Sequence, residues 1–153
     1  MLLSFSHRRM LPWVRRGIVD TTKRHPNEVP YHTAHLDHAG ERMMRQSMRP
    51  AYDRAGGPTK WHDVLPETKL QLWWKSGTRD RQQLGTVVLF TIDPIWIRND
   101  DGRLFHGTGF DPAESGERDD FVWLSEGFLT EAEALAFFCP RNGEAYLGFL
   151  MRW

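Results

Sequence analysis

The chain has 153 residues, of which 40% are hydrophobic and 26% are charged, as is typical of a globular protein of one domain. No apolar run approaches the roughly 20 residues that a membrane-spanning helix needs. The apolar start is too short for a signal peptide, and its basic residues follow the apolar stretch instead of preceding it. We therefore expect one soluble α+β domain over residues 1–153, located in the cytoplasm.

The formal net charge of zero hides an uneven distribution along the chain. Residues 1–81 contain 15 Lys and Arg against 8 Asp and Glu, a net charge of +7, and the remaining residues contain 5 against 12, a net charge of −7. Such segregation favours a basic face for an anionic partner and an acidic flank elsewhere. If the fold interleaves the two halves, however, their fields cancel.

The first elements are short. Residues 2–6, LLSFS, are apolar enough for a strand, and Leu11, Val14 and Ile18 recur at helical spacing after them. Gly17 is expected to end this helix.

From Val19 to about Pro66 the chain loses its periodicity and contains five prolines, so we expect an insertion at about residues 27–65. One helix is predicted inside it, from about Gly40 to Met48, before Pro50. Its methionines are more typical of packing than of a partner groove.

The second half has clearer patterns. KLQLWW, residues 69–74, alternates like a strand, and LGTVVLFTIDPIWIR, residues 84–98, predicts two strands with a turn or bulge at Asp93 and Pro94. A hairpin and an exposed acidic loop follow. Thr130 and Glu133 form a capping box for a helix, and residues 145–153 predict a closing strand. Cys139 is the only cysteine, which excludes an internal disulfide, and its apolar surroundings predict a buried, inert thiol.

Basic and aromatic residues are interleaved in two stretches of the chain. Cations neutralise phosphates, and indole faces stack on unpaired bases. The alternatives without a binding role are a solvated helix face for the arginines and a core position for Trp73 or Trp74, since alternation buries one of the two. The candidate nucleic-acid-binding residues are Arg15, Arg16, Lys23, Arg24, Trp73, Lys75, Arg79 and Arg81.

The histidines also invite a metal hypothesis. His32, His35 and His38 recur at every third residue, but three residues at this spacing cannot share one tight helix face, and no Cys partner or HExxH motif accompanies them. We therefore predict no metal site and no cofactor.

Three segments, in chain order, resemble parts of a known family. LLSFSHRRMLPWVRRGI is similar to an opening strand and helix that lead into a Gly-x-Lys-x-x-x-x-Arg motif, which Gly17 and Arg24 match. KLQLWWKSGTRDRQQLG resembles a strand and turn, and SEGFLTEAEALAFF resembles an Asp/Glu-Gly-Phe segment with its helix. Together they resemble the ASCH domain, phage-type, of the PUA-like superfamily. The resemblance implies a small mixed β-barrel with short flanking helices.

The resemblance also implies candidate catalytic residues. Some small ASCH proteins are amidohydrolases that remove an acyl group from modified cytidine, which would give catalytic roles to Thr22, Lys23 and Glu126. Val19 occupies the position of the motif's lysine, and a threonine hydroxyl is a weak nucleophile without an adjacent base.

Our leading hypothesis is therefore a nucleic-acid-binding module without catalysis, directed to RNA, to single-stranded nucleic acid or to a modified base. The alternatives are an amidohydrolase of acylated cytidine-type nucleosides and a phage accessory protein that binds a host protein through residues 27–65.

Overall fold

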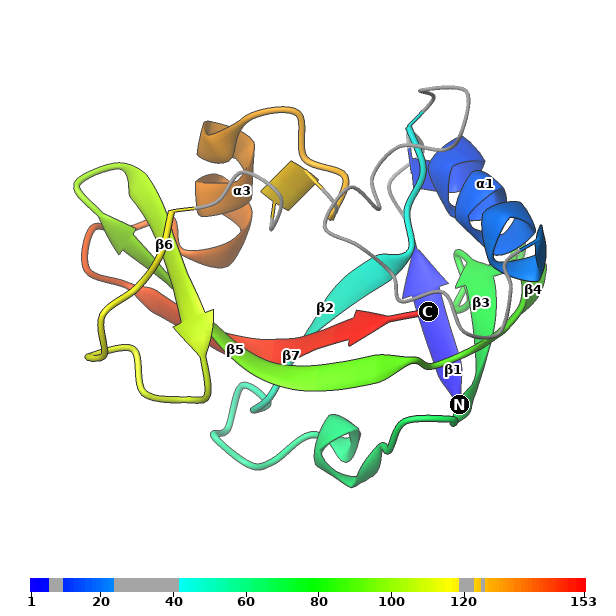
Figure 1. Ribbon diagram of the computed structural model, residues 1–153, viewed down its shortest axis with the longest axis horizontal. Helices are drawn as coiled ribbons and strands as arrows, with labels where there is room; N and C mark the ends of the chain where they lie inside the picture. The colour runs from blue at the N-terminus through cyan, green and yellow to red at the C-terminus, as the bar shows by residue number, and fades with distance from the viewer. Residues whose placement is uncertain (6–9, 24–41, 119–122, 125) are drawn as a thin grey trace.

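The computed structural model describes residues 1–5, 10–23, 42–118, 123–124 and 126–153, without the side chains of residues 20–23. Within these residues, seven strands form two sheets, and helices α1 and α3 flank them (Figure 1). The predicted α+β class is confirmed. Among the described helices, none combines the length and the apolar character that a membrane span requires.

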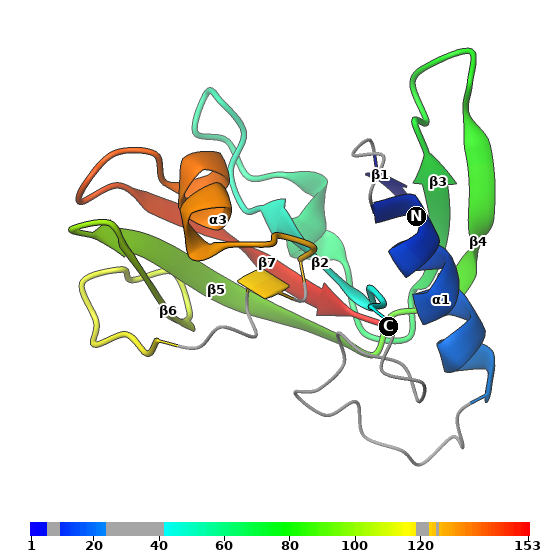
Figure 2. The ribbon, with the colours of Figure 1, turned by 90° about the horizontal axis from the view of Figure 1, so that it is seen from above.

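The first sheet consists of three strands in the order β1 (Leu2–Phe5), β3 (Lys69–Trp74) and β4 (Gln82–Val88). Strand β1 runs parallel to β3, while β3 and β4 form an antiparallel hairpin. Helix α1 (Met10–Lys23) covers one face, where Ile18 lies against Gly85 so closely that a Cβ on the glycine would meet it at 3.1 Å. The turn of the hairpin projects beyond α1 (Figure 2).

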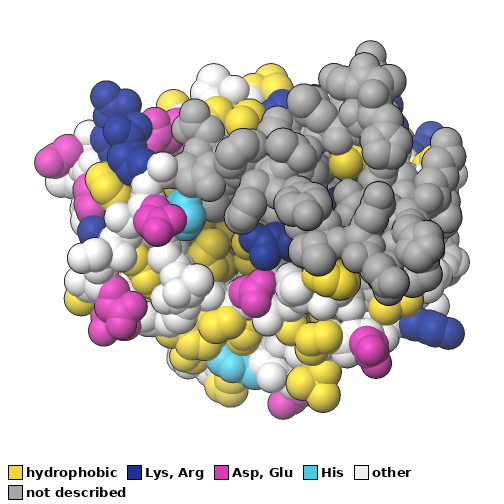
Figure 3. Space-filling view, in the orientation of Figure 1, with side chains coloured by type: hydrophobic (Ala, Val, Ile, Leu, Met, Phe, Trp, Pro, Cys, Tyr) yellow, Lys and Arg dark blue, Asp and Glu magenta, His cyan; other side chains and the backbone are white. Residues whose placement is uncertain are grey.

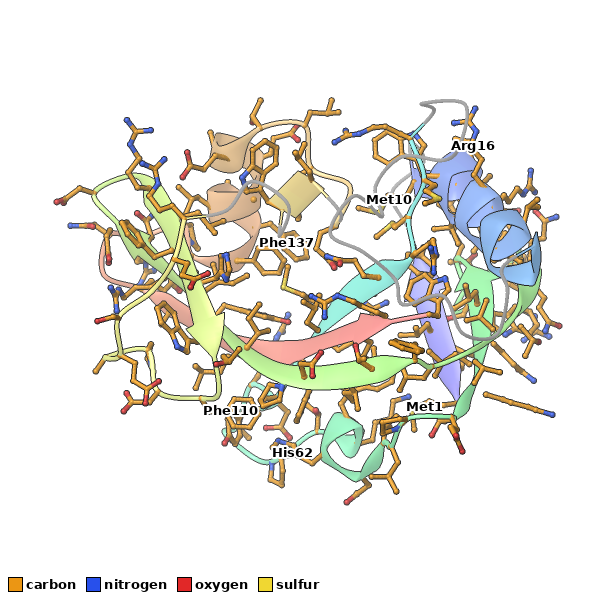
Figure 4. All side chains as sticks on the ribbon, viewed as in Figure 1. Met1, Met10, Arg16, His62, Phe110 and Phe137 are labelled. Atoms are coloured by element: carbon orange, nitrogen blue, oxygen red, sulfur yellow. The ribbon has the colours of Figure 1, made fainter. Side chains whose placement is uncertain are left out.

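The second sheet is antiparallel, in the order β2 (Gln46–Pro50), β7 (Ala145–Arg152), β5 (Thr91–Asp100) and β6 (Arg103–Thr108). Helix α3 (Glu131–Phe138) packs on one side of it, and the short 3-10 helix η1 (Lys60–Asp63) precedes β3. Figure 4 shows Phe137 of α3 on the opposite side of this sheet from His62 and Phe110.

Two hydrophobic clusters hold the fold together. The first joins both sheets and α1, and includes Leu3, Val14, Leu72, Trp74, Met151 and Trp153. The second lies under α3, and includes Ile97, Leu104, Leu135, Phe138, Cys139 and Leu150. Burying each large side chain contributes about 1.5–3 kcal/mol. Because the first cluster draws on β1, β3 and β7, it fixes the two sheets relative to each other.

Several predicted elements are confirmed. Strands appear at β1, β3 and β7, and Asp101 and Gly102 turn between β5 and β6 as expected. Thr130 caps α3, because its side chain accepts a hydrogen bond of 3.2 Å from the Glu133 amide. The sequence patterns therefore locate these elements correctly.

The prediction that Gly17 ends the first helix is wrong, because α1 continues to Lys23. A Cβ at Gly17 would lie 1.9 Å from the carbonyl oxygen of Met44. The glycine is needed for this close approach between the helix and the chain before β2, and not for a helix end.

The predicted helix at residues 40–48 is also wrong in its described part, since Gln46–Pro50 forms strand β2. Strand β2 pairs with β7, with Met48 opposite Leu150. It lies inside the range expected as an insertion, yet it is an integral strand of the second sheet. Met43, Met44 and Met48 are buried, which confirms that they pack in the core.

The predicted turn or bulge at Asp93 and Pro94 is wrong as well. Both residues lie inside β5 and pair with β7 without a register shift, and the chain turns at Leu89 and Phe90. Pairing with β6 begins one residue later, at Ile95. The Pro94 carbonyl accepts a hydrogen bond from the Gly109 amide at 2.9 Å. The nitrogen of Pro94 points to the same side of β5 as this carbonyl, where β6 has already ended. The missing N–H therefore costs no ladder hydrogen bond.

No strand pairing of the described residues closes the two sheets into a barrel. Among the described strands, none pairs with the outer edge of β1 or with that of β2. Side chains of Arg49 and Glu126, described below, satisfy backbone groups on these two edges.

Candidate functional site

The β3–β4 turn, residues 75–81, forms a compact basic loop. Lys75 adopts a left-handed conformation with φ of 46°, and its carbonyl accepts from both the amide and the hydroxyl of Thr78 at 3.0 Å. The Ser76 amide donates to Ser4 Oγ at 3.1 Å, which fastens the turn to β1. The exposed side chains of Arg79 and Arg81 follow. The turn thus presents three cations against one carboxylate on a fixed backbone.

These three cations are not paired with a carboxylate in the part of the chain that the structure describes. Among the described residues, no carboxylate lies within ion-pair distance of Lys75, Arg79 or Arg81. Lys75 instead places Nζ 5.8 Å from the centre of the Trp74 ring. The positive charge of the turn is therefore available to an anionic ligand.

Four arginines of the second sheet and its loops contrast with those of the turn. They form the ion pairs Arg98–Asp100 (2.7 Å), Arg103–Glu131 (3.8 Å), Arg118–Glu131 (3.7 Å) and Arg152–Asp93 (3.2 Å). In Figure 3 the dark-blue side chains over the β6 end of the molecule stand beside magenta ones. The positive charge at that end is balanced locally.

The two tryptophans of β3 separate as the alternation predicts. Trp74 is buried in the first cluster, whereas Trp73 is half-buried and points to the opposite face. A bulge between Leu72 and Trp73 leaves Leu84 as an extra residue on β4. The indole Nε1 of Trp73 donates to Gln71 Oε1 at 3.4 Å. Trp73 is thus the aromatic residue beside the basic turn that a ligand can reach.

The arginines of α1 lie in different surroundings. Arg15 donates to Gln82 Oε1 of β4 at 3.1 Å, which brings it to the base of the hairpin. It approaches from the face covered by α1, opposite Trp73. Arg16 donates to the Arg42 carbonyl at 3.1 Å and is half-buried, so the structure does not place it with the turn.

Several other predicted site residues lie wholly or partly outside the described residues. Thr22 and Lys23 belong to the last turn of α1, but their side chains lie outside the described residues, as does Arg24. The histidines at 32, 35 and 38 also lie outside them. Within the described part of the chain, no group of His, Cys, Asp and Glu side chains could hold a metal ion.

Glu126 is described, and its carboxylate is buried at the open edge of β2. One oxygen accepts from the Met48 amide at 2.9 Å and the other from Gln46 Nε2 at 3.2 Å. Burial raises the pKa of Glu126 to about 7, against the opposing effects of these hydrogen bonds and of Arg49 and Arg152. The carboxyl group therefore changes its charge near neutral pH.

Sequence reasoning missed Arg49, which bridges the two sheets. Its Nη2 donates to the Ser4 carbonyl of β1 at 3.1 Å and its Nη1 to the Met48 carbonyl at 2.9 Å. The guanidinium lies 5.7 Å from the centre of the Phe5 ring, and burial lowers its pKa. The adjacent Pro50 was the only local signal, and it suggested a helix end instead of an edge strand.

The thiol of Cys139 is fully buried and donates to the Ile97 carbonyl at 3.3 Å. Burial raises its pKa to about 11. The prediction that the thiol is buried is confirmed, and its inertness stays a prediction.

Comparison of the chain with protein-family models, with curated proteins and with solved structures gives no match.

Proposed function

We propose that this protein binds nucleic acid, RNA or another single strand, through the turn at residues 75–81 and the adjoining Trp73. The observation that carries the proposal is the turn itself, whose Lys75, Arg79 and Arg81 have no acidic partner among the described residues. Cations in this state can neutralise phosphates and release counterions, which favours binding at low salt. Arg15 adds a cation at the base of the hairpin, on the face covered by α1 and opposite Trp73.

The proposed site includes part of the predicted set of residues. Trp73, Lys75, Arg79 and Arg81 belong to one hairpin, and Arg15 lies at the base of this hairpin on the opposite face from Trp73. The contributions of Lys23 and Arg24 stay predictions. The family resemblance stays a proposal too: a PUA-like barrel in this chain would be an open one, with Arg49 spanning the gap between β1 and β2. The phage origin and the host partner rest on that resemblance alone.

A second candidate function is the amidohydrolase of acylated cytidine. The near-neutral pKa of Glu126 favours it, because a general acid or base works best when its pKa lies near the working pH. An argument against it is that both carboxylate oxygens of Glu126 already accept hydrogen bonds from residues of β2. Release of cytidine from an acylated nucleoside, followed by chromatography, tests this activity directly.

Fluorescence anisotropy of a labelled single-stranded RNA tests the nucleic-acid proposal. The informative variant is the double substitution Arg79→Ala with Arg81→Ala. Its control is Arg103→Ala with Arg118→Ala, which removes the same charge from arginines that are paired with Glu131. We expect the turn variant to weaken binding and to lower the dependence of log K on log salt by about 2, and the control to leave that dependence nearly unchanged.

Equal losses in the two variants would mean that only net charge matters, and would contradict the assignment to the turn. Absence of binding by the unmodified protein at low salt would overturn the function itself.

A further inference from the structure

One face of the three-stranded sheet is open to solvent. Leu70, Leu72 and Trp74 point into the core beneath α1. The opposite side chains are exposed, except for the half-buried Trp73, and the polar and aromatic ones among them are Ser4, Lys69, Gln71, Trp73, Gln83 and Thr86.

The three described strands bring no negative charge to this open face. The strands LLSF, KLQLWW and QQLGTVV contain no Asp or Glu, and Lys69 is their only charged residue. The basic turn adjoins one end of the same face. The charge of the sheet and its turn therefore complements an anionic ligand and does not repel it.

A hydrogen bond joins Trp73 to a neighbour on the open face. Gln71 is two residues earlier on the same strand and on the same face, and its Oε1 accepts from the indole Nε1 at 3.4 Å. The indole is only half-buried, so part of its ring is accessible on this face. Ser4 and Gln83 are the cross-strand neighbours of Trp73 on either side.

We propose that the accessible part of the Trp73 indole stacks on an unpaired base of a single-stranded nucleic acid, with the amides of Gln71 and Gln83 facing the edge of that base. This inference rests on the proposed function and adds the form of its ligand. An amide side chain offers both a donor and an acceptor, as base edges do. Bases inside a duplex are stacked on one another and cannot lie on an indole, so the face selects single strands.

The test compares three labelled ligands of equal length: a single-stranded oligonucleotide, a duplex, and a strand of abasic sites with the same phosphates. Trp73→Ala should weaken binding of the normal single strand about 5- to 150-fold, the factor expected from loss of one base–aromatic stack. Trp73→Phe should restore most of it. Binding of the abasic strand should be weaker than that of the normal strand and insensitive to Trp73→Ala. The control Val88→Ala removes an exposed apolar side chain elsewhere on β4.

Two failures can be told apart. If Trp73→Ala leaves single-strand affinity unchanged while binding stays salt-dependent, or if the duplex binds as tightly as the single strand, the stacking inference is overturned and the basic turn remains. If none of the three ligands binds at low salt, the result contradicts both the proposed function and this inference.

Discussion

Arg49 of β2 donates a hydrogen bond to the carbonyl of Ser4, on the open edge of β1, across the gap between the two sheets. At the open edge of β2, the Glu126 carboxylate accepts a hydrogen bond from the Met48 amide. At these two edges, a carbonyl of β1 and an amide of β2 are thus satisfied by a side chain in place of a strand. Edges blunted in this way do not recruit further strands, and the sheets stay joined without closing.

Replacing Arg49 by Met should therefore destabilise the fold. The substitution keeps the apolar stem but removes two hydrogen bonds donated by a charged group to backbone carbonyls. Hydrogen bonds of this kind contribute about 1.5–3 kcal/mol each, so we expect a loss of a few kcal/mol in the free energy of unfolding by urea. Arg54→Met, at an exposed loop position, is the control. Equal stabilities of the two variants would contradict the bridging role of Arg49.

The titration of Glu126 should make stability depend on pH. Its folded-state pKa of about 7 lies above the ordinary value of 4.5, so its stabilising contribution is fully present below about pH 4.5 and is lost as the pH rises through 7. The loss amounts to roughly 3 kcal/mol. Arg49 and Arg152 oppose the shift, whereas burial dominates it.

Glu126→Gln isolates this effect, because glutamine can still accept from the Met48 amide while Gln46 turns its amide. We expect the variant to lose the part of the decline in stability between about pH 5 and pH 8 that Glu126 causes. Urea unfolding at several pH values measures the difference. Identical pH profiles for the variant and the unmodified protein would rule out Glu126 as the titrating group.

Gly17→Ala should destabilise the packing of α1. Its new Cβ would lie 1.9 Å from the Met44 carbonyl oxygen, so the helix must move. Overpacking of this kind costs about 1–3 kcal/mol, more than the helix propensity of alanine returns. Gly77→Ala is the matched control, because a Cβ there meets nothing within 4 Å. Thermal unfolding should show a lower Tm for the Gly17 variant only, and a raised Tm would refute the close-approach explanation.

Thr130→Ala should remove the cap of α3. The Thr130 hydroxyl accepts from the Glu133 amide, and loss of such a cap costs about 1 kcal/mol. Thr130→Ser preserves the acceptor and should retain most of the stability. If both variants lose the same stability, the hydrogen bond is not the cause.

Local patterns predicted the elements whose signals are local. The capping box at Thr130 and the alternation of residues 69–74 depend on neighbours in the sequence, and both were correct. Strand β2 was missed because its partner β7 lies at the far end of the chain. The helix end predicted at Gly17 was wrong for a similar reason. The contact that requires a glycine there comes from Met44 and not from the helix itself.

In the candidate site, too, residues close in sequence could be predicted and contacts between distant segments could not. The basic turn could be predicted because Lys75, Arg79 and Arg81 are adjacent in one hairpin. Arg49 could not, because its role depends on the distance between two sheet edges, which no sequence period encodes. The lack of acidic partners around the turn, among the described residues, could not be predicted either, because it depends on which carboxylates the fold brings near the turn.

The most direct test of the central claim is to map the contact surface by NMR, from amide chemical shifts during titration with a single-stranded oligonucleotide. We predict that the largest shifts fall on residues 69–86, around Trp73 and the basic turn, and disappear at high salt. Shifts confined to the second sheet and its loops, or no shifts at low salt, would contradict the account.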